Sequence, residues 1–496
     1  MRRYGQKLTD ALIQPAARDG AWARGDALGH AVALTWTVGD VRGAERPVDG
    51  PSLRAAGGYQ KPDATELRLF RKAVRELEKV SGIEMVEVDG PADMTFHVYQ
   101  RGPLLGWANN FRADREGGVA MRALETLPGP KRWTEIALHE LGHAVGLDHP
   151  FENTRLPRKL DNTRHTLMSY DEAGPTKAKF RGLDVATLQR LYGADEDLTV
   201  RARRDGGVDV FGGDGRDAMA LSFARRTGPD GQGPDALYGG GGADRLIAGA
   251  RADGALYGGA GRDRLEASFT RDRGRDGLSA EGGAGDDLFD IDRPGARLMG
   301  GSGDDEARLT ARSAGARFHG EGGDDVLVTS GRLQDVAFYG GAGDDAAKLK
   351  TASGQRLFGG GGDDRLIGAA RSDGGRGDDR LIGSVGRDRL KGGAGRDDLL
   401  GLEGVDRLFG GRGADRLAAE GDGDTLYGDA GRDQLFGGDL GDRTPERGES
   451  RAALHGGAGD DALFGGATAR GGGGDDAVTA EIAYGGAGDD RIDAAD

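Results

Sequence analysis

Residues 374–382 read Gly-Gly-Arg-Gly-Asp-Asp-Arg-Leu-Ile, and units of the same length and pattern follow along the chain. In each unit an aspartate lies five residues after the first glycine, and a leucine lies two residues after that aspartate. Glycine permits tight turns, and the leucine supplies one apolar side chain per unit. Because a single unit cannot bury that side chain alone, the period predicts a stack of short strands. Successive units open at Gly374, Gly383, Gly392, Gly401 and Gly410.

The repeated aspartates are candidate metal ligands. Turns rich in glycine expose carbonyl oxygens, and these together with a carboxylate favour a hard cation such as Ca²⁺. The pattern resembles Gly-Gly-x-Gly-x-Asp-x-U-x, the calcium-binding nonapeptide of RTX proteins. This resemblance implies an all-β parallel β-roll that binds several Ca²⁺ ions and depends on them for folding. The aspartates assigned to calcium in this register are Asp379, Asp388, Asp397, Asp406, Asp415, Asp424 and Asp433.

Further upstream the motif recurs at about twice the spacing. Two nonapeptides make one turn of a roll, so we expect residues 282–366 to carry calcium loops along one edge only. Residues 374–437 are expected to carry them on both edges. A disordered Gly/Asp-rich tail is the alternative, but it would not keep leucine in register. The upstream aspartates assigned to calcium are Asp287, Asp305, Asp325, Asp345 and Asp364.

Residues 139–150 carry a different motif, His-Glu-Leu-Gly-His-Ala-Val-Gly-Leu-Asp-His-Pro. On a helix, His139 and His143 project from one face, and two imidazoles supply half of a tetrahedral zinc site. Gly146 tolerates positive φ and can turn the chain back, which brings His149 in as a third ligand. Three protein ligands leave one position open, as is typical of catalytic zinc sites. The ordinary alternative is an amphipathic helix whose histidines face solvent.

The segment Met168-Ser169-Tyr170 follows this motif, and together they resemble the serralysin branch of the metzincin metallopeptidases. The resemblance implies an α+β metzincin-type catalytic domain with one catalytic Zn²⁺. It also implies that Met168 forms a hydrophobic floor and that Tyr170 is a further ligand that stabilises the oxyanion. Glu140 would act as general base toward water on the zinc. The residues assigned to zinc are His139, His143, His149 and Tyr170, and those assigned to catalysis are Glu140 and Tyr170.

Charge and glycine divide the chain into two halves. Residues 1–200 hold 28 Lys+Arg and 28 Asp+Glu, so the remaining residues account for the whole net charge of −16. They also hold 73 of the 94 glycines. We therefore expect a catalytic domain over residues 1–197 and a β-roll over residues 198–496. The acidic excess argues against nucleic acid as a partner.

Local patterns predict several elements of the first half. Strands are expected over residues 31–38, 83–88 and 94–98. Asp63 and Glu66 form a capping-box pattern ahead of a helical apolar stripe, and Thr134 is the expected N-cap of the zinc helix. Residues 117–122 are a candidate edge strand, which either pairs with an extended substrate or has no such role.

The resemblance implies a secreted, calcium-dependent zinc endopeptidase that acts on protein or peptide substrates. No apolar h-region follows the basic N-terminus, so a cleavable signal peptide is not expected, and RTX proteins of this type are typically exported through a one-step exporter. No apolar run is long enough to span a membrane, the absence of cysteine excludes disulfides, and we expect a monomer. The rival interpretation is a calcium-dependent surface or adhesive protein whose peptidase-like head is inactive or narrowly specific.

Overall fold

A computed structural model of the chain separates into two compact units. The first comprises Met1–Tyr257 with Ser268–Gly274, and the second comprises Gly258–Ala267 with Arg275–Asp496. The structure describes residues 31–38, 59–87, 92, 94–99, 106–109, 117–127, 129–149, 163, 166–170, 178–192, 199–202, 208–221, 236–248, 254–267, 278–350, 354–421, 423–438 and 452–494.

The first unit is built on a mixed sheet. Its central strand β1 (Ala31–Val38) pairs in parallel with β3 (Ile83–Glu87) and with β4 (Met94–Tyr99). Strand β4 in turn pairs in parallel with β6 (Gly117–Arg122), and β5 (Gly106–Asn109) closes the row antiparallel to β6. The three strands expected over residues 31–38, 83–88 and 94–98 are therefore confirmed within one residue at each end.

The expectation that residues 117–122 form an edge strand is wrong. Strand β6 is bonded on both sides, to β4 and to β5. Of the described strands, β5 lies at that edge of the sheet. The sequence did not reveal this because β5 is only 4 residues long and carries no alternating apolar pattern.

Helix α3 (Ala64–Glu78) begins with the expected capping box. The backbone N–H of Glu66 donates to Asp63 Oδ1, and the N–H of Asp63 donates to a carboxylate oxygen of Glu66. The other oxygen of Glu66 accepts the N–H of Leu124 at 2.9 Å, so this residue also ties the helix to the short 3₁₀ helix η1 (Leu124–Thr126). The capping prediction is confirmed.

Helix α4 (Pro130–Ala144) carries the histidine motif and begins five residues earlier than expected. Its N-cap is Gly129, and Pro130 occupies the first helical position, where the missing N–H costs nothing. Thr134 lies inside the helix and donates its hydroxyl to the carbonyl of Pro130. The N-cap prediction for Thr134 is therefore wrong, because a proline start was overlooked.

Aromatic side chains join the helices to the sheet. Phe70 of α3 stacks on Phe96 of β4 with ring centroids 3.8 Å apart, and Trp36 of β1 meets Phe70 edge-on at 5.1 Å. Trp133 of α4 packs edge-on against Phe96 at 6.2 Å. All four rings are buried, so α4 is anchored by a core that involves no metal.

The first unit also contains one further helix and several short strands. Strand β9 pairs in parallel with both β1 and β11, while β8 pairs with β7 and β10. These elements are α5 (Gly182–Tyr192), β2 (Tyr59–Gln60), β7 (Thr199–Ala202), β8 (Val208–Phe211), β9 (Ala218–Leu221), β10 (Ala236–Gly241) and β11 (Arg245–Ala248).

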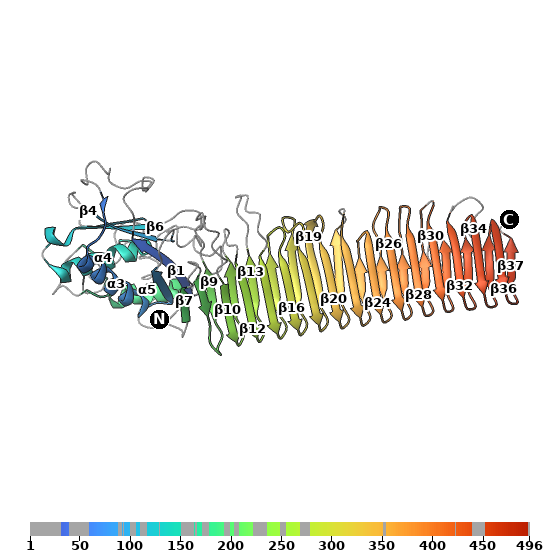
Figure 1. The fold of residues 1–496 in the computed structure, drawn as a ribbon, viewed down its shortest axis with the longest axis horizontal. Coiled ribbons are helices and arrows are strands. Elements are labelled where there is room, and N and C mark those ends of the chain that lie inside the picture. Colours follow the sequence, from blue (N-terminus) through green and yellow to red (C-terminus); the bar gives the residue numbers. More distant parts are fainter. Residues whose placement is uncertain are drawn as a thin grey trace. The chain divides into compact units, whose positions relative to one another are not determined.

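The second unit is a parallel β-roll, which confirms the fold predicted from the repeats (Figure 1). Even-numbered strands form one sheet and odd-numbered strands form the other. The even-numbered strands are β14 (Ser279–Ala284), β16 (Arg297–Ser302), β18 (Arg317–Gly322), β20 (Ala337–Ala342), β22 (Arg356–Gly361), β24 (Arg371–Arg376), β26 (Arg389–Ala394), β28 (Arg407–Arg412), β30 (Thr425–Ala430), β32 (Ala453–Ala458), β34 (Thr468–Gly473) and β36 (Ile482–Ala487), and β12 (Ala255–Ala260) precedes them. The odd-numbered strands are β13 (Arg264–Ala267), β15 (Leu288–Ile291), β17 (Glu306–Thr310), β19 (Val326–Arg332), β21 (Ala346–Lys350), β23 (Arg365–Ile367), β25 (Arg380–Ile382), β27 (Asp398–Leu400), β29 (Arg416–Ala418), β31 (Gln434–Gly437), β33 (Ala462–Gly465), β35 (Ala477–Ala480) and β37 (Arg491–Ala494).

The roll has a narrow apolar core made of one or two inward side chains per strand. Inward leucines of successive turns lie directly opposite one another, as Leu390 does to Leu408. The tight loops use glycine where the backbone takes positive φ, for example 116° at Gly301 and 122° at Gly303. The repeated leucines all point into the core and are buried: Leu381, Leu390, Leu399, Leu408, Leu417, Leu426 and Leu435.

Candidate metal centres

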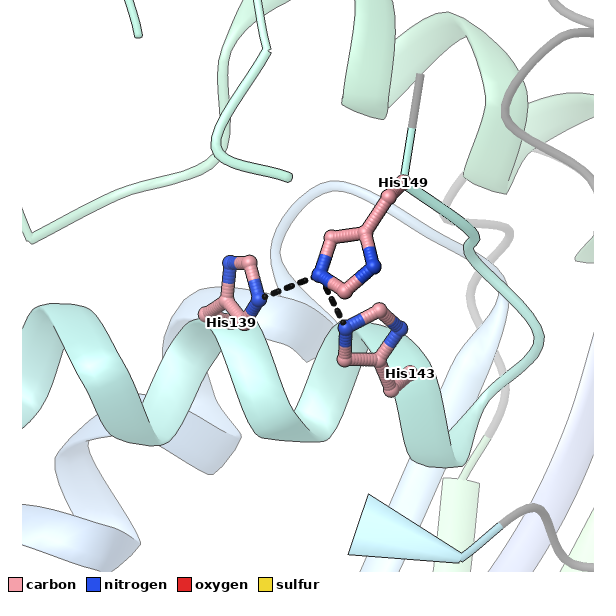
Figure 2. A group of neighbouring side chains, drawn as sticks. All are labelled: His139, His143 and His149. Carbon is pink, nitrogen blue, oxygen red and sulfur yellow. Dashed lines mark hydrogen bonds between the residues drawn. The ribbon is translucent and has the colours of Figure 1, made fainter. Parts of the chain in front are cut away.

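Three imidazole rings converge at the end of helix α4 (Figure 2). His139 and His143 come from the helix, and His149 comes from the segment after it. The Nε2 atom of His149 lies 3.2 Å from Nε2 of His139 and 3.0 Å from Nε2 of His143. Two nitrogens bound to one tetrahedral zinc at ordinary bond lengths are about 3.3 Å apart. The spacing therefore fits three ligands of one small cation.

The protonation of these rings is compatible with binding of a cation. The Nδ1 atoms of His139 and His143 face the carbonyls of Leu167 and Leu147 at 3.0 and 2.9 Å. A carbonyl only accepts, so each Nδ1 carries the proton and each Nε2 presents a lone pair. Burial lowers the pKa of His139 to about 3 and that of His143 to about 4, and it also lowers the pKa of His149. At neutral pH the rings of His139 and His143 are therefore uncharged, and their Nε2 atoms can accept a hydrogen bond or bind a metal ion.

A tight turn after α4 brings His149 back to the helix. The N–H of Leu147 donates to the carbonyl of Gly142 and the N–H of Gly146 donates to the carbonyl of His143. These two bonds form a Schellman motif. Gly146 has φ of 96°, a conformation that a residue with a Cβ adopts only with strain. The turn that the sequence assigns to Gly146 is thus where the structure places it.

Met168 and Tyr170 flank the cluster in different ways. Met168 is fully buried, and a Cβ on Gly142 would lie 2.9 Å from its sulfur, so the thioether packs directly against α4 between the two helical histidines. Tyr170 is 66% exposed, with its ring centroid 4.6 Å from that of His149 and 5.7 Å from that of His139. The tyrosine stands beside the imidazoles on the solvent side.

Glu140 is buried against the neighbouring strand β5. A Cβ on Gly106 would lie 2.6 Å from Cγ of Glu140, so only glycine leaves room for the carboxylate here. Burial raises the pKa of Glu140 to about 8. A carboxyl group with such a pKa can both hold and release a proton near neutral pH.

Helix α5 braces the cluster through a residue that sequence analysis missed. The carboxylate of Asp184 accepts the hydroxyl of Thr166 and the N–H groups of Leu167 and Arg181, at 2.5, 2.7 and 2.8 Å. Leu167 is the residue whose carbonyl faces His139 Nδ1. Asp184 therefore fixes the acceptor that orients a metal ligand, an arrangement common behind metal-binding histidines. Burial raises its pKa to about 6 despite these bonds.

The same helix makes a second contact with the turn after α4. The buried hydroxyl of Tyr192 donates to the carbonyl of Val145 at 2.5 Å. Val145 is the C-cap of α4 and directly precedes Gly146. Helix α5 thus holds both the turn that returns His149 and the segment that contains Met168.

The roll carries a continuous ladder of motif aspartates along one side. We call the loops that lead from an even-numbered strand to the next odd-numbered strand the first edge, for example residues 303–305. At this edge the N–H of each motif aspartate donates to Oδ1 of the corresponding aspartate one turn later, as Asp287 does to Asp305 at 2.7 Å. The first-edge ladder includes Asp263, Asp287, Asp305, Asp325, Asp345, Asp364, Asp379, Asp397, Asp415, Asp433, Asp461, Asp476 and Asp490.

The second oxygen of these aspartates is suited to a cation. Oδ2 is buried, with no hydrogen bond from any described residue, in Asp287, Asp305, Asp325 and nine others. A Cβ on Gly300 would lie 2.1 Å from Oδ2 of Asp305 and 2.7 Å from the carbonyl oxygen of Gly320. The same arrangement surrounds the first glycine of most first-edge loops. Carboxylate and carbonyl oxygens that converge on a glycine-lined space fit Ca²⁺. The others are Asp345, Asp364, Asp379, Asp397, Asp415, Asp433, Asp461 and Asp476 on the first edge, together with Asp406 on the opposite edge.

Burial without a counter-ion raises the pKa of these carboxyl groups. The pKa of Asp325 and of Asp364 rises to about 8, and that of Asp287 and of Asp305 rises to about 7. Neighbouring aspartates add repulsion in each case. In the absence of calcium the roll therefore buries carboxyl groups that resist ionisation at neutral pH.

The second edge, formed by the loops from odd- to even-numbered strands, carries fewer motif aspartates. The N–H of Asp388 donates to Oδ1 of Asp406, and that of Asp406 donates to Oδ1 of Asp424. Asp388 differs because the backbone N–H and the hydroxyl of Ser384 both donate to its carboxylate. Between residues 282 and 366 the motif aspartates all lie on the first edge, which is the placement that their spacing predicted.

Sequence analysis missed several members of the first-edge ladder. Asp217 donates its N–H to Asp244, and Asp263, Asp461 and Asp476 continue the same pattern. Each of these aspartates follows a Gly-Gly-x-Gly stretch, so the signal was present. They were missed because the search followed a strict nine-residue period, whereas turns of the roll differ in length.

Four segments of the chain match the sequence model of the RTX calcium-binding nonapeptide repeat, over residues 230–254, 355–370, 373–408 and 409–443. The chain therefore contains RTX calcium-binding repeats, and proteins with such repeats are typically secreted. No curated protein matches the chain. The match does not extend to the histidine cluster. Within the described residues, no helix has the length and apolar character needed to cross a membrane.

Proposed function

We propose that this protein is a secreted, calcium-dependent zinc endopeptidase of the metzincin type. The observation that carries the proposal is the convergence of three Nε2 atoms, with the Nδ1 atoms of His139 and His143 facing backbone carbonyls. The neutral state of the rings and their spacing fit one Zn²⁺ ion. Because only three protein ligands are involved, a position remains for water and substrate.

The residues around the cluster could perform the catalytic and supporting roles that a zinc peptidase requires. Zinc in such a site lowers the pKa of a bound water to about 7 and polarises a carbonyl. Glu140 would accept a proton at its carboxylate and return it to the leaving amine, for which a pKa near neutrality is suitable. Tyr170 would donate its hydroxyl to the oxyanion from the exposed side of the cluster. Met168 and Asp184 would keep the ligands in position.

The roll gives the proposal its calcium dependence. Each turn buries a carboxylate beside converging carbonyl oxygens, so calcium would complete the fold of the second unit. Calcium is plentiful outside cells, and RTX repeats are typical of secreted proteins. We therefore propose that the chain is exported, folds when it meets calcium, and is then active.

The test is hydrolysis of casein by the full chain with zinc and millimolar calcium, compared with Glu140→Gln. This substitution keeps the shape of the side chain but removes its ability to accept a proton. The expected result is cleavage by the wild type and a loss of at least about 100-fold in the variant. Equal zinc content and equal melting temperature of the two proteins serve as controls, because they separate lost chemistry from lost structure.

A different class of function remains as the alternative outcome. The repeats alone would also support a calcium-dependent surface or adhesive protein, and only the repeat half matches a known family. If a folded, zinc-loaded wild type cleaves neither casein nor a library of unstructured peptides, the peptidase proposal fails and this alternative replaces it.

A further inference from the structure

The outward face of the even-numbered strands carries a row of four consecutive arginines. Arg356, Arg371, Arg389 and Arg407 are the first residues of β22, β24, β26 and β28, and each lies directly opposite the next. All four are exposed. Adjacent strands are about 4.7–4.9 Å apart, so four positive charges stand at intervals of one strand along a straight line.

This arrangement destabilises the roll by itself. Like charges directly opposite on a sheet repel, and one strand spacing is well within the screening length of about 8 Å at physiological salt. Some arginines of the roll are paired with carboxylates, as Arg264 is with Asp290 and Arg312 is with Asp292. None of the four row arginines forms an ion pair with any residue that the structure describes.

The fold does not require arginine at these positions. In the same row, β20 begins with Ala337, β30 with Thr425 and β34 with Thr468. All of these strands have the same register and the same inward side-chain pattern. A side chain without charge is therefore compatible with this row, and the four arginines are surplus to folding.

The corresponding row on the opposite sheet is interrupted by a negative charge. The corresponding row of the odd-numbered strands contains Arg365, Arg380, Asp398 and Arg416 in register. Asp398 separates Arg380 from Arg416 and offsets their charge. The two rows belong to the same turns of the roll, yet only the even-numbered row presents an uninterrupted line of positive charge.

An aromatic contact fixes one of the row arginines. The guanidinium of Arg389 lies 4.5 Å from the ring centroid of Phe409 on the same face, a favourable cation–π distance. The other face of Phe409 is stacked on Tyr427 at 5.0 Å. The charged row therefore borders two stacked aromatic rings, and the contact with Phe409 restricts the motion of the Arg389 side chain.

We propose that this arginine row binds a linear anionic polysaccharide whose sugars bear carboxylates or sulfates. Such a chain carries many negative charges along one line, and these complement the line of positive charge that the row presents. Guanidinium groups bind such oxyanions with two parallel hydrogen bonds. A bound polyanion removes the repulsion between the arginines. This site is independent of the histidine cluster.

The geometry disfavours the other polyanions. Duplex DNA presents its phosphates along a helical path that leaves a flat row after a few charges. Single strands are usually bound by aromatic rings with open faces, whereas Phe409 and Tyr427 are stacked on each other. A membrane surface is usually met by basic residues together with exposed apolar side chains, and within the row the neighbouring outward residues include Asp373 and Lys391, which form an ion pair.

The test is binding of short oligogalacturonates to the full chain at a fixed free calcium concentration. The double variant Arg371→Thr/Arg389→Thr uses the residue that occupies the same row at positions 425 and 468. We expect it to weaken binding at least about tenfold, because two charge-assisted contacts are lost. The matched control Arg365→Thr/Arg380→Thr removes the same charge from the opposite sheet and should change affinity less than threefold. Both variants should bind calcium like the wild type, and neither should melt at a lower temperature than the wild type.

Several outcomes would overturn the proposal. It fails if the wild type does not bind the oligogalacturonates, if uncharged galactan oligomers bind equally well, or if both double variants lose affinity to the same extent. It also fails if single-stranded DNA or anionic phosphatidylserine vesicles bind more tightly than the oligogalacturonates in a manner that depends on Arg371 and Arg389, because the row would then serve a different class of partner.

Discussion

The histidine cluster and the aspartate ladder both bring candidate metal-binding atoms together, but they stand in different surroundings. The cluster rests on helix α4, which is anchored by Trp36, Phe70, Phe96 and Trp133. The ladder rests on a core to which each strand contributes only one or two side chains, with a buried carboxylate in almost every turn. We therefore expect the first unit to fold without a metal, whereas in the second unit calcium binding and folding should be coupled.

Removal of calcium should produce the largest difference in stability between the two units. With EGTA at pH 7.5 we expect the roll to lose most of its β-structure, because the buried carboxylates then repel one another, while the helices of the first unit remain. Far-UV circular dichroism and thermal melting of the full chain would measure this. Adding calcium should restore both signals and adding magnesium should not. A roll that stays folded in EGTA would show that its apolar core suffices.

Without calcium, the roll should lose thermal stability as the pH rises. The folded-state pKa values of Asp325 and Asp364 are about 8, and those of Asp287 and Asp305 are about 7, all above the unfolded value of about 3.9. Groups whose pKa is raised on folding contribute stability below the unfolded pKa and lose it as pH rises through the folded value. The melting temperature in EGTA should therefore fall between pH 5 and pH 8.

Saturating calcium supplies the control for this pH series. A bound cation favours the ionised carboxylates, so the fall in melting temperature should disappear or reverse. If the melting temperature in EGTA instead rises from pH 5 to pH 8, the buried aspartates are ionised without metal and the proposed linkage is wrong.

A smaller effect is expected when the support of the histidine cluster is altered. In Asp184→Asn the acceptor of the Leu167 N–H loses its charge, which should loosen the carbonyl that orients His139. Loss of such an outer contact typically weakens metal binding about 10- to 100-fold. Competition with a chromophoric chelator would measure the zinc affinity of the variant and of the wild type, and this measurement does not depend on activity.

Thr187→Val is the matched control for this variant. Thr187 is buried on the same helix and donates to the carbonyl of Leu183, but it does not contact the Leu167 segment. Its zinc affinity should equal that of the wild type. Equal losses in both variants would mean that α5 acts only through overall stability.

The smallest expected effect concerns a single polar defect in the roll core. Ser372 replaces the usual leucine between Leu357 and Leu390, and its buried hydroxyl has no hydrogen-bond partner among the described residues. Ser372→Ala should raise the free energy of unfolding of the calcium-loaded roll by about 1 kcal/mol. Ser384→Ala should lower the free energy of unfolding, because the hydroxyl of Ser384 donates a hydrogen bond to Asp388. Calcium-saturated urea unfolding would compare the two, and a loss of stability in Ser372→Ala would contradict the prediction.

Much of the site was readable from local spacing. The four-residue interval of His139 and His143, the glycine at 146 and the capping box of Asp63 all act within a few residues, so the sequence predicts their geometry directly. The sequence did not predict the hydrogen bonds by which helix α5 supports the cluster, because Asp184 and Tyr192 bond to partners that are 17 and 47 residues away in the chain. An aspartate or a tyrosine on a short helix carries no local signal of such contacts.

By itself, the sequence determined the elements that depend on local period: which strands repeat, which leucines turn inward, and which aspartates and histidines are available for metal. Only the tertiary structure decided which of these groups meet. Turns of the roll differ in length, so stacking rather than spacing brought Asp364 opposite Asp379 and aligned Arg356 with Arg371. In the first unit, a carbonyl 28 residues away set the orientation of His139. Local steric preferences fix an element within a few residues, whereas register and long-range hydrogen bonds are fixed only when apolar surfaces pack together.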